Sequence, residues 1–266
     1  MKTGLIAGYG TIPVVAAENL IRQGHELFVI ALYEEVTADF SHLENVEVKK
    51  FSVTQVGKII KCLKNNNVDK VLFAGKVNKT LLFSDLKLDM TAVKLLASTI
   101  NRKDDTLMNA ICDEMNANGI DVMKQTEGLG SLFIEKGVYS KKKPSKHQMD
   151  DIEFGLQIAR ELGRIDVGQT VVVKDKAVMA LEAIEGTDKA VVRGCELARK
   201  DAVVVKCAKP SQDERFDIPT VGIDTIKNLA NNNGKVLAVE AGATFVVDME
   251  ACIKLANEKK IIFLAI

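Results

Sequence analysis

Short apolar runs and amphipathic stretches alternate along the first half of the chain. Apolar runs that end at glycine or polar residues predict strands, and apolar residues at helical spacing predict helices. The helix predicted after Thr54, its expected N-cap, carries an apolar face formed by Val56, Ile59, Ile60 and Leu63. The predicted strands are residues 5–7, 27–32, 46–51, 71–74 and 121–123, and the other predicted helices are residues 12–23, 90–100 and 106–118. This alternation predicts a parallel sheet covered by helices, a Rossmann-like N-terminal domain over residues 1–134.

The pattern changes over residues 135–150, where Gly137, a run of three lysines and Pro144 interrupt the periodicity. We predict a linker there and a second domain over residues 151–266. A helix is predicted over residues 148–162, and one further helix on either side of the third strand. The strands are predicted at residues 170–173, 178–183, 202–207, 237–240 and 244–247. Because several strands follow one another closely, we predict a mixed-sheet α/β C-terminal domain rather than a second Rossmann half.

Charge and cysteine content narrow the classes of protein. The 266 residues include 36 Lys and Arg and 36 Asp and Glu. The zero net charge argues against a nucleic-acid binder that relies on bulk positive charge. The five cysteines form no CxxC pair, so we expect no zinc knuckle or disulfide framework and favour a reducing compartment. No apolar stretch reaches the roughly 18 residues that span a bilayer, and the N-terminal run is too short for a signal peptide, so we expect a cytoplasmic protein.

Two glycine-bearing segments follow predicted strands of the first half. Gly8 and Gly10 lie between a strand and a helix, where backbone N–H groups and the helix N-terminus favour phosphate. Pro13 stands where a dinucleotide fingerprint has its third glycine, which weakens an NAD interpretation. Gly75 and Lys76 end a later strand, at the edge where open α/β sheets bind ligands. A simple tight turn and a solvated lysine are the alternatives.

Carboxylates stand at two predicted helix starts. Asp105 precedes an amphipathic helix, and N-capping with an acidic first turn explains it without a ligand. In the second half a strand meets a helix in the segment that holds Glu182, Glu185, Gly186, Thr187 and Asp188. Capping explains Asp188 but leaves the two glutamates unexplained. Carboxylates beside an anion site often hold Mg²⁺, so a metal ligand is the functional interpretation.

The densest polar segment directly follows a strand and is bounded by two prolines. Its charged and amide side chains are Lys206, Lys209, Gln212, Asp213, Arg215 and Asp217. Lysine and arginine can hold a diphosphate, and the aspartates can bind a metal or orient a water. Glu240 closes another apolar strand and adds a carboxylate at the same edge. A solvated loop and a strand-to-turn junction are the alternatives.

The remaining sequence lacks other catalytic patterns. His25, His42 and His147 share no spacing that suggests a metal site or a base for a nucleophile. There is no GxSxG elbow, Cys–His arrangement or Walker A sequence, so covalent catalysis is not indicated.

Five segments together resemble the LpxI family of UDP-2,3-diacylglucosamine pyrophosphatases. They are residues 4–13, 74–77, 185–188, 206–220 and 240–242, and their order and spacing match along nearly the whole chain. The most specific is Lys-x-x-Lys-Pro-x-Gln-Asp-x-Arg-x-Asp-x-Pro-Thr over residues 206–220. The chain departs from the family in the basic pair Arg102-Lys103, where many members carry glycine.

The resemblance implies an enzyme of lipid A biosynthesis in a bacterium with an outer membrane. Such enzymes hydrolyse UDP-2,3-diacylglucosamine to 2,3-diacylglucosamine 1-phosphate (lipid X) and UMP, and they require a divalent cation, usually Mg²⁺. The resemblance also implies a lipid substrate held between a Rossmann-like domain and a distinct C-terminal domain. It further implies an essential aspartate in the long motif, either Asp213 or Asp217, a homodimer, and transient contact with the cytoplasmic face of the inner membrane.

The charge of a diphosphate leads to a mechanistic hypothesis. The negative charge of the diphosphate repels an attacking water. Mg²⁺ held by Asp188, Asp213 and Asp217 would neutralise this charge. In an alternative, one of the motif's aspartates acts as general base. The predicted substrate contacts are Gly8, Gly10, Gly75, Lys76, Asp105, Gly186, Thr187, Lys206, Lys209, Gln212, Arg215 and Glu240. The alternative function is a non-catalytic nucleotide-binding or NAD(P)-dependent Rossmann protein, which leaves the long motif unexplained.

Overall fold

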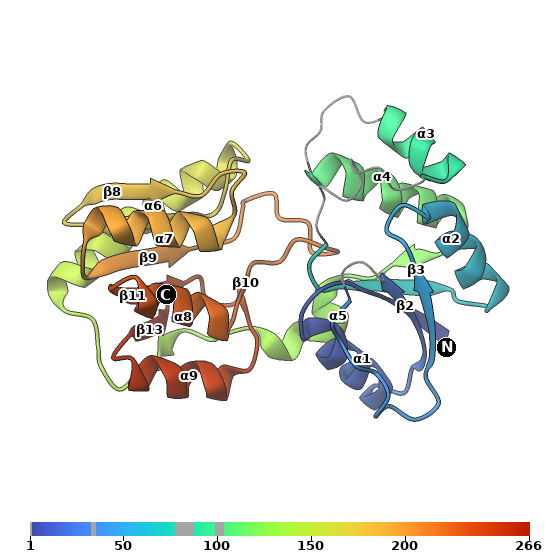
Figure 1. Ribbon diagram of the computed structural model, residues 1–266, viewed down its shortest axis with the longest axis horizontal. Coiled ribbons are helices and arrows are strands. Elements are labelled where there is room, and N and C mark those ends of the chain that lie inside the picture. Colours follow the sequence, from blue (N-terminus) through green and yellow to red (C-terminus); the bar gives the residue numbers. More distant parts are fainter. Residues whose placement is uncertain (1, 33–35, 78–87, 99–103) are drawn as a thin grey trace. The chain divides into compact units, whose positions relative to one another are not determined.

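The computed structural model describes residues 2–32, 36–77, 88–98 and 104–266, apart from the side chains of residues 104 and 105. The chain divides into two compact units (Figure 1). Unit 1 comprises Met1–Gly130 and the short segment Asp213–Phe216, and unit 2 comprises Ser131–Gln212 and Asp217–Ile266. The segment predicted as a linker, residues 135–150, holds β6 (Gly137–Val138) and the start of α6 (Lys146–Arg164) within unit 2.

Unit 1 contains a five-stranded parallel sheet in the order β3-β2-β1-β4-β5. Its strands are β1 (Lys2–Ala7), β2 (Glu26–Leu32), β3 (Glu47–Phe51), β4 (Lys70–Ala74) and β5 (Asp121–Val122). Its helices are α1 (Ile12–Arg22), α2 (Val56–Asn65), α3 (Met90–Ser98), α4 (Asp104–Ala117) and α5 (Gln125–Leu129). The Rossmann-like prediction is confirmed, and the strand order reverses between β1 and β4, where such sheets bind ligands.

The start of α2 differs from the prediction. The N-cap is Gln55 rather than Thr54, whose buried hydroxyl lies 2.9 Å from that of Ser52. The carboxylate of Asp89 instead accepts hydrogen bonds from backbone N–H groups in the first turns of both α2 and α3. The predicted apolar face of α2 is confirmed, because its four residues are buried: Val56, Ile59, Ile60 and Leu63. The last two residues of the helix predicted over 90–100 lie outside the described residues.

Unit 2 contains a six-stranded mixed sheet in the order β6-β13-β11-β9-β7-β8. Its other strands are β7 (Thr170–Lys174), β8 (Ala177–Leu181), β9 (Ala202–Lys206), β11 (Gly234–Val239) and β13 (Ile262–Ala265). β9, β11 and β13 are parallel, whereas β6, β7 and β8 run antiparallel to their neighbours. The mixed-sheet prediction is therefore confirmed. The segment predicted as a strand over 244–247 forms β12 (Phe245–Val246), which pairs with β10 (Thr220–Val221) outside this sheet.

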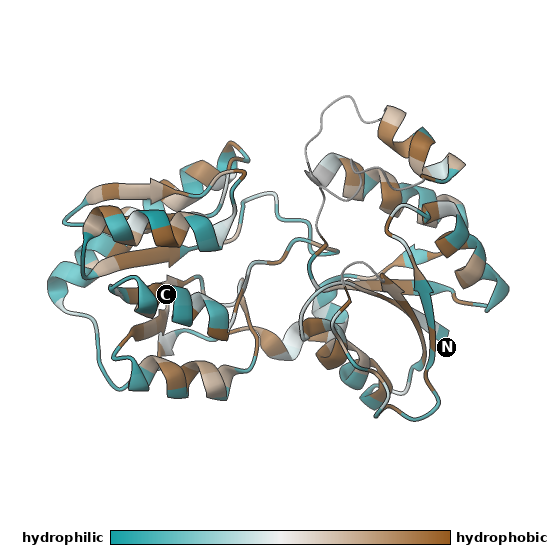
Figure 2. Ribbon diagram, viewed as in Figure 1, coloured by the Kyte–Doolittle hydropathy of each residue, from teal (hydrophilic) through white to brown (hydrophobic). Residues whose placement is uncertain are grey.

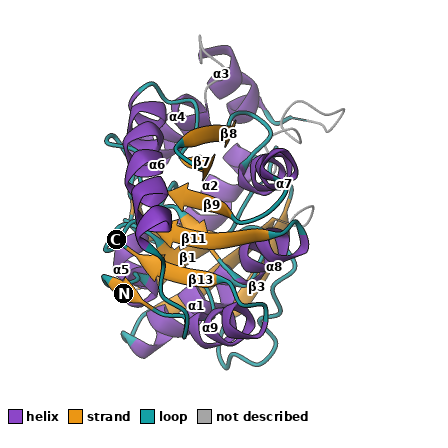
Figure 3. Ribbon diagram, turned by 90° about the vertical axis from the view of Figure 1, so that its left-hand side faces the viewer, coloured by secondary structure: helices purple, strands orange, loops and turns teal. Residues whose placement is uncertain are grey.

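Helices cover both faces of the unit 2 sheet (Figure 3). α6 lies on one face, and α7 (Thr187–Ala198), α8 (Ile223–Asn231) and α9 (Met249–Glu258) lie on the other. Strands buried on both faces are apolar without interruption, as the hydrophobic colouring of the central strands in Figure 2 shows. Val172 and Val204 pack with residues of α7, α8 and α9, whereas Val171 and Val203 belong to clusters with α6. Because side chains alternate between the faces of a strand, residue 170, two positions before Val172, and residue 206, two positions after Val204, also project toward the α7 face.

Candidate functional site at the carboxyl edge of the unit 2 sheet

Three polar residues lie in a row across the strand ends at one edge of the unit 2 sheet. Thr170 pairs with Lys206 in the β7–β9 ladder, and the backbone N–H of Glu182, just after β8, donates to the carbonyl of Thr170 at 2.9 Å. Directly opposite residues on adjacent strands project to the same face, so all three side chains lie on the α7 face. They are buried, with Lys206 only 6% and Glu182 only 8% exposed. Burial of an ammonium and a carboxylate requires polar partners.

A chain of hydrogen bonds joins this row to the start of α7. The Lys206 ammonium donates to Thr187 Oγ1 at 3.2 Å and to the carbonyl of Thr220 at 3.1 Å. The Thr187 hydroxyl donates in turn to Glu182 Oε1 at 2.8 Å. The N-cap of α7 is Gly186, with φ of +81°, and no side chain caps the helix there. An uncapped helix N-terminus beside a lysine attracts anions, and the predicted residues Gly186, Thr187 and Lys206 are thus brought together.

Buried polar atoms without a partner gather in the same region. Among the described residues, four buried side-chain atoms have no hydrogen-bond partner: Gln169 Oε1, Thr170 Oγ1, Glu182 Oε2 and Thr244 Oγ1. The first three lie where β7 begins and β8 ends. Thr244 precedes β12, whose Phe245 pairs with Thr220. Leaving a buried acceptor unpaired costs free energy, so such atoms call for a functional explanation.

A second polar network in unit 2 holds three more of the predicted residues. Lys209 Nζ lies 3.0 Å from Asp166 Oδ1 and 3.2 Å from Asp217 Oδ2. Gln212 Nε2 donates to Asp217 Oδ2 at 2.6 Å, and Gln212 Oε1 accepts from the Lys209 backbone N–H at 2.9 Å. Lys209, Gln212 and Asp217 are therefore mutually bonded, with Asp166 as a partner that the sequence analysis missed.

Asp213 and Arg215 belong to unit 1, although Asp217 belongs to unit 2. Asp213 Oδ1 accepts from the Arg215 backbone N–H at 2.9 Å and from Nε at 3.0 Å, and Oδ2 accepts from Nη2 at 2.7 Å. Arg215 also donates to Asn109 of α4. These side-chain hydrogen bonds from Arg215 hold the pKa of the Asp213 carboxyl below its usual value. Both carboxylate oxygens of Asp213 are thus engaged by one guanidinium.

Glu240 and Asp188, both in unit 2, have partners of their own. Glu240 Oε1 lies 3.0 Å from Arg160 Nη2 on α6, and Oε2 accepts from the Ala208 backbone N–H at 2.9 Å. Asp188 Oδ1 accepts from Asn228 Nδ2 at 3.0 Å. Glu240 therefore anchors the loop that follows β9, and Asp188 joins α7 to α8.

The glycine loops of unit 1 meet where the strand order reverses. The backbone N–H of Gly8 donates to Ala74, and Tyr9 and Lys76 exchange two backbone hydrogen bonds of 2.7 and 3.0 Å. A Cβ at Gly8 would lie 2.4 Å from the Lys76 carbonyl oxygen, and Gly75 has φ of +90°. The close approach of two loops therefore explains both glycines.

Two further predicted contacts lie in unit 1. The Gly10 N–H donates to Thr37 Oγ1 at 3.1 Å, and Gly10 has φ of +99°. The backbone N–H groups of residues 8 to 10 are thus already used within the protein, which leaves them less available to a phosphate. Asp105 lies in the first turn of α4, and its side chain falls outside the described part of the chain.

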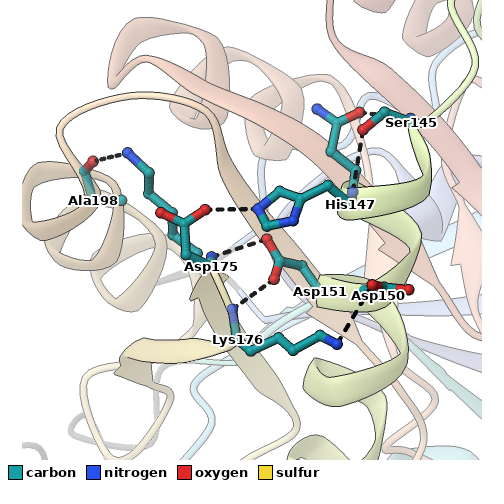
Figure 4. Close-up of polar contacts among 9 residues, drawn as sticks. Ser145, His147, Asp150, Asp151, Asp175, Lys176 and Ala198 are labelled. Atoms are coloured by element: carbon teal, nitrogen blue, oxygen red, sulfur yellow. Dashed lines mark hydrogen bonds and ion pairs between the residues drawn. The ribbon is translucent and has the colours of Figure 1, made fainter.

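A different polar cluster lies at the opposite end of β7, around the β7–β8 turn (Figure 4). Asp151, on α6, is 2% exposed and accepts from the backbone N–H groups of Asp175 at 3.1 Å and Lys176 at 2.7 Å. His147 Nε2 lies 2.7 Å from Asp175 Oδ1, and this hydrogen bond, with nearby aspartate charge, raises the pKa of the His147 ring. One ligand atom each from His147, Asp151 and Asp175 lie within 4.8 Å of one another, so this group could hold a metal ion. Histidine spacing along the sequence did not reveal it.

Comparisons with known proteins cover both units. The model of the LpxI N-terminal domain matches residues 2–132, and that of the LpxI C-terminal domain matches residues 135–264. The UDP-2,3-diacylglucosamine pyrophosphatase LpxI of Caulobacter vibrioides is 34% identical over 268 aligned positions, which cover 97% of this chain and 94% of that protein. In the described residues, no helix has the length and apolar character needed to cross a membrane.

Solved structures give only weak likeness. Pal from Bacillus thuringiensis covers all of this chain and 85% of its own, at 12% identity and a TM-score of 0.33. The Bordetella bronchiseptica enzyme WbmG in complex with NAD covers 45% of this chain and 35% of its own, at 17% identity and a TM-score of 0.30. Scores this low support no conclusion about fold or function. Because the two family models together match nearly the whole chain and the Caulobacter relative aligns along its length, this chain belongs to the LpxI family.

Proposed function

We propose that this chain hydrolyses the diphosphate of UDP-2,3-diacylglucosamine to 2,3-diacylglucosamine 1-phosphate and UMP, with Mg²⁺ as cofactor. The observation that carries the proposal is the buried Lys206 beneath the uncapped N-terminus of α7, in a chain that aligns with a pyrophosphatase over 97% of its length. The glycine loops of unit 1 do not favour the NAD(P) alternative, because the N–H groups of Gly8 and Gly10 are engaged within the protein.

The residues of this edge suit a diphosphate. The Lys206 ammonium and the partial positive charge of the α7 N-terminus would neutralise the phosphate oxygens as charge develops in the transition state. Lys209 and Gln212 both contact Asp217 and would fix the loop that carries it. Asp217 would in turn bind the cation or orient the attacking water. Arg215 and Asp213 belong to unit 1, and their part in the reaction rests on the family resemblance.

Carboxylate chemistry in the long motif fits Mg²⁺, which prefers oxygen ligands. Gln212 Nε2 and Lys209 Nζ both contact the Asp217 carboxylate at Oδ2. Asp188 likewise receives its bond from Asn228 at Oδ1. Asp213 offers a poorer fit, since Arg215 engages both of its oxygens. We propose Asp217 and Asp188 as ligands of the cation, which would neutralise the diphosphate; a role for Asp213, which belongs to unit 1, rests on the family resemblance alone.

The hydrolysis itself breaks one phosphoanhydride bond. Water attacks the phosphorus on the sugar side, its oxygen remains with the sugar phosphate, and UMP leaves. In the alternative to a ligand role, Asp217 would take the proton of that water as general base. Because the proposed substrate carries acyl chains, we also propose transient contact with the cytoplasmic face of the inner membrane, and a homodimer remains a prediction.

The test is release of UMP from UDP-2,3-diacylglucosamine by the purified protein, with Mg²⁺ and with EDTA. We expect Mg²⁺-dependent release from the acylated substrate and none from UDP-N-acetylglucosamine. No release by folded protein would overturn the proposal.

A matched control separates the two places where a cation could bind. His147→Gln removes the nitrogen ligand at the β7–β8 turn without touching the Lys206 edge. If the catalytic cation binds at Asp217, the Mg²⁺ concentration for half-maximal activity stays at the wild-type value in this variant and rises in Asp217→Asn. The reverse pattern would place the catalytic cation at the turn.

A further inference from the structure

Glu182 is held firmly at the end of β8. Its backbone N–H donates to Thr170, and a Cβ on Gly168 would lie 2.2 Å from its carbonyl oxygen. Its carboxylate is buried, and Oε1 accepts the hydroxyl of Thr187, while Oε2 has no partner. The chain therefore keeps a buried acidic group that the fold leaves half satisfied.

The hydrogen bond to Glu182 determines what Thr187 can do. A hydroxyl has one proton to donate and two lone pairs to accept with. Because Thr187 gives its proton to Glu182, its oxygen can only accept from the Lys206 ammonium, at 3.2 Å. Glu182 thus determines which group donates and which accepts in both hydrogen bonds that connect its carboxylate to the Lys206 ammonium.

The charges in this chain also depend on one another. An ammonium as deeply buried as that of Lys206 loses most of its hydration, which a nearby negative charge offsets. Glu182 lies one hydroxyl away from the ammonium along the hydrogen-bond chain. It can therefore balance the charge of Lys206 while the ammonium remains at the α7 N-terminus, where an anion would bind.

We propose that Glu182 is a positioning residue that acts through Thr187 to hold the Lys206 ammonium in place for the diphosphate. This inference rests on the proposed function and deepens it, since it names the residue that organises the phosphate site. The buried Oε2 has no hydrogen-bond partner, which costs free energy. Buried polar groups that violate the usual packing rules concentrate at functional sites.

The experiment is a double-mutant cycle on turnover. Loss of a residue that orients a ligand-binding group through a hydrogen bond typically lowers activity by about 10- to 100-fold. We therefore expect Glu182→Ala to lower kcat by that factor. Thr187→Val should cause a similar loss, and Thr187→Ser, which keeps the hydroxyl, should restore most of the wild-type kcat. Both substitutions interrupt the same hydrogen-bond path from Glu182 to Lys206. The double variant Glu182→Ala/Thr187→Val should therefore have a kcat no lower than that of the slower single variant.

Three results would decide against the proposal. They are a wild-type kcat in folded Glu182→Ala, equal losses in Thr187→Ser and Thr187→Val, and a double variant whose loss is the product of the single losses. If Glu182→Ala does not fold, the valine and serine variants of Thr187 still decide. Calorimetric titration with UDP gives a readout apart from turnover, and the affinity should fall in Glu182→Ala. Absence of UMP release by the wild type would instead contradict the proposed function.

Discussion

Asp151 and Glu182 are buried carboxylates at opposite ends of the same strand pair in unit 2, and they differ in how the fold uses them. Both oxygens of Asp151 accept backbone N–H groups of the β7–β8 turn. That turn needs them, because Asp175 and Lys176 have φ of +53° and +56° without a glycine. Glu182 has one bonded oxygen and one without a partner. The turn accounts for the carboxylate of Asp151, whereas we account for that of Glu182 by the role proposed for it at the phosphate site.

The largest difference between the two ends should appear in activity. Lys206→Met removes the ammonium at the α7 N-terminus, and we expect kcat/KM to fall by about 100-fold or more, as for loss of a group that stabilises transition-state charge. Lys176→Met removes an exposed lysine at the turn, paired with Asp150 at 3.4 Å, and should keep the wild-type rate. Steady-state UMP release measures both. Equal rates for the two variants would contradict the assignment of the phosphate site to the Lys206 edge rather than to the β7–β8 turn.

The next effect concerns stability at the turn. Asp151→Asn replaces one of two acceptor oxygens by an NH₂ group facing a backbone N–H, so the free energy of unfolding should fall by about 2 kcal/mol. Urea denaturation measures the change, and kcat should stay at the wild-type value. A large loss of kcat in folded Asp151→Asn would show that this carboxylate is not merely structural.

Glu182→Gln should change stability less than the turn variant does. The amide oxygen can keep the hydrogen bond from Thr187, and the atom replaced at Oε2 has no partner to lose. We expect the free energy of unfolding to change by less than about 1 kcal/mol. Urea denaturation beside Asp151→Asn gives the comparison, and an equal loss in both variants would indicate that Glu182 has a structural role like that of Asp151.

The smallest effect is a pH dependence at the turn. The hydrogen bond to Asp175 raises the pKa of His147 above 6.5, so the protonated ring is favoured in the folded state. The stabilisation is therefore complete below the unfolded pKa and is lost as pH rises through the higher folded pKa. The melting temperatures of the wild type and of His147→Gln should differ most at about pH 5.5 and should approach one another at about pH 8.5. Divergence toward high pH would contradict the assignment.

Much of the fold could be predicted from the chain because the central strands of both sheets are buried. The valine runs of β7 and β9 read as strands, and the polar residues that end β9 mark the edge where Lys206 lies. β13 carried the same apolar signal and was missed, as was α9 before it. β6 is two residues long, too short for any periodicity to show.

The segments that hold candidate site residues could be predicted, but many contacts between residues far apart in sequence could not. The motif over residues 206–220 was found, but the structure divides it, since Asp213–Phe216 belongs to unit 1. Asp166 reaches Lys209 from 43 residues away, and His147 reaches Asp175 from 28 residues away. Such pairs depend on how α6 packs on the sheet, which a single sequence does not reveal.

The most direct test of the central claim is a crystal structure with UDP and Mg²⁺ bound. We predict phosphate oxygens within about 3 Å of Lys206 Nζ and of the first N–H groups of α7, the range of charge-assisted hydrogen bonds. A diphosphate bound instead at the Gly8–Gly10 loop of unit 1, with none at α7, would contradict the account.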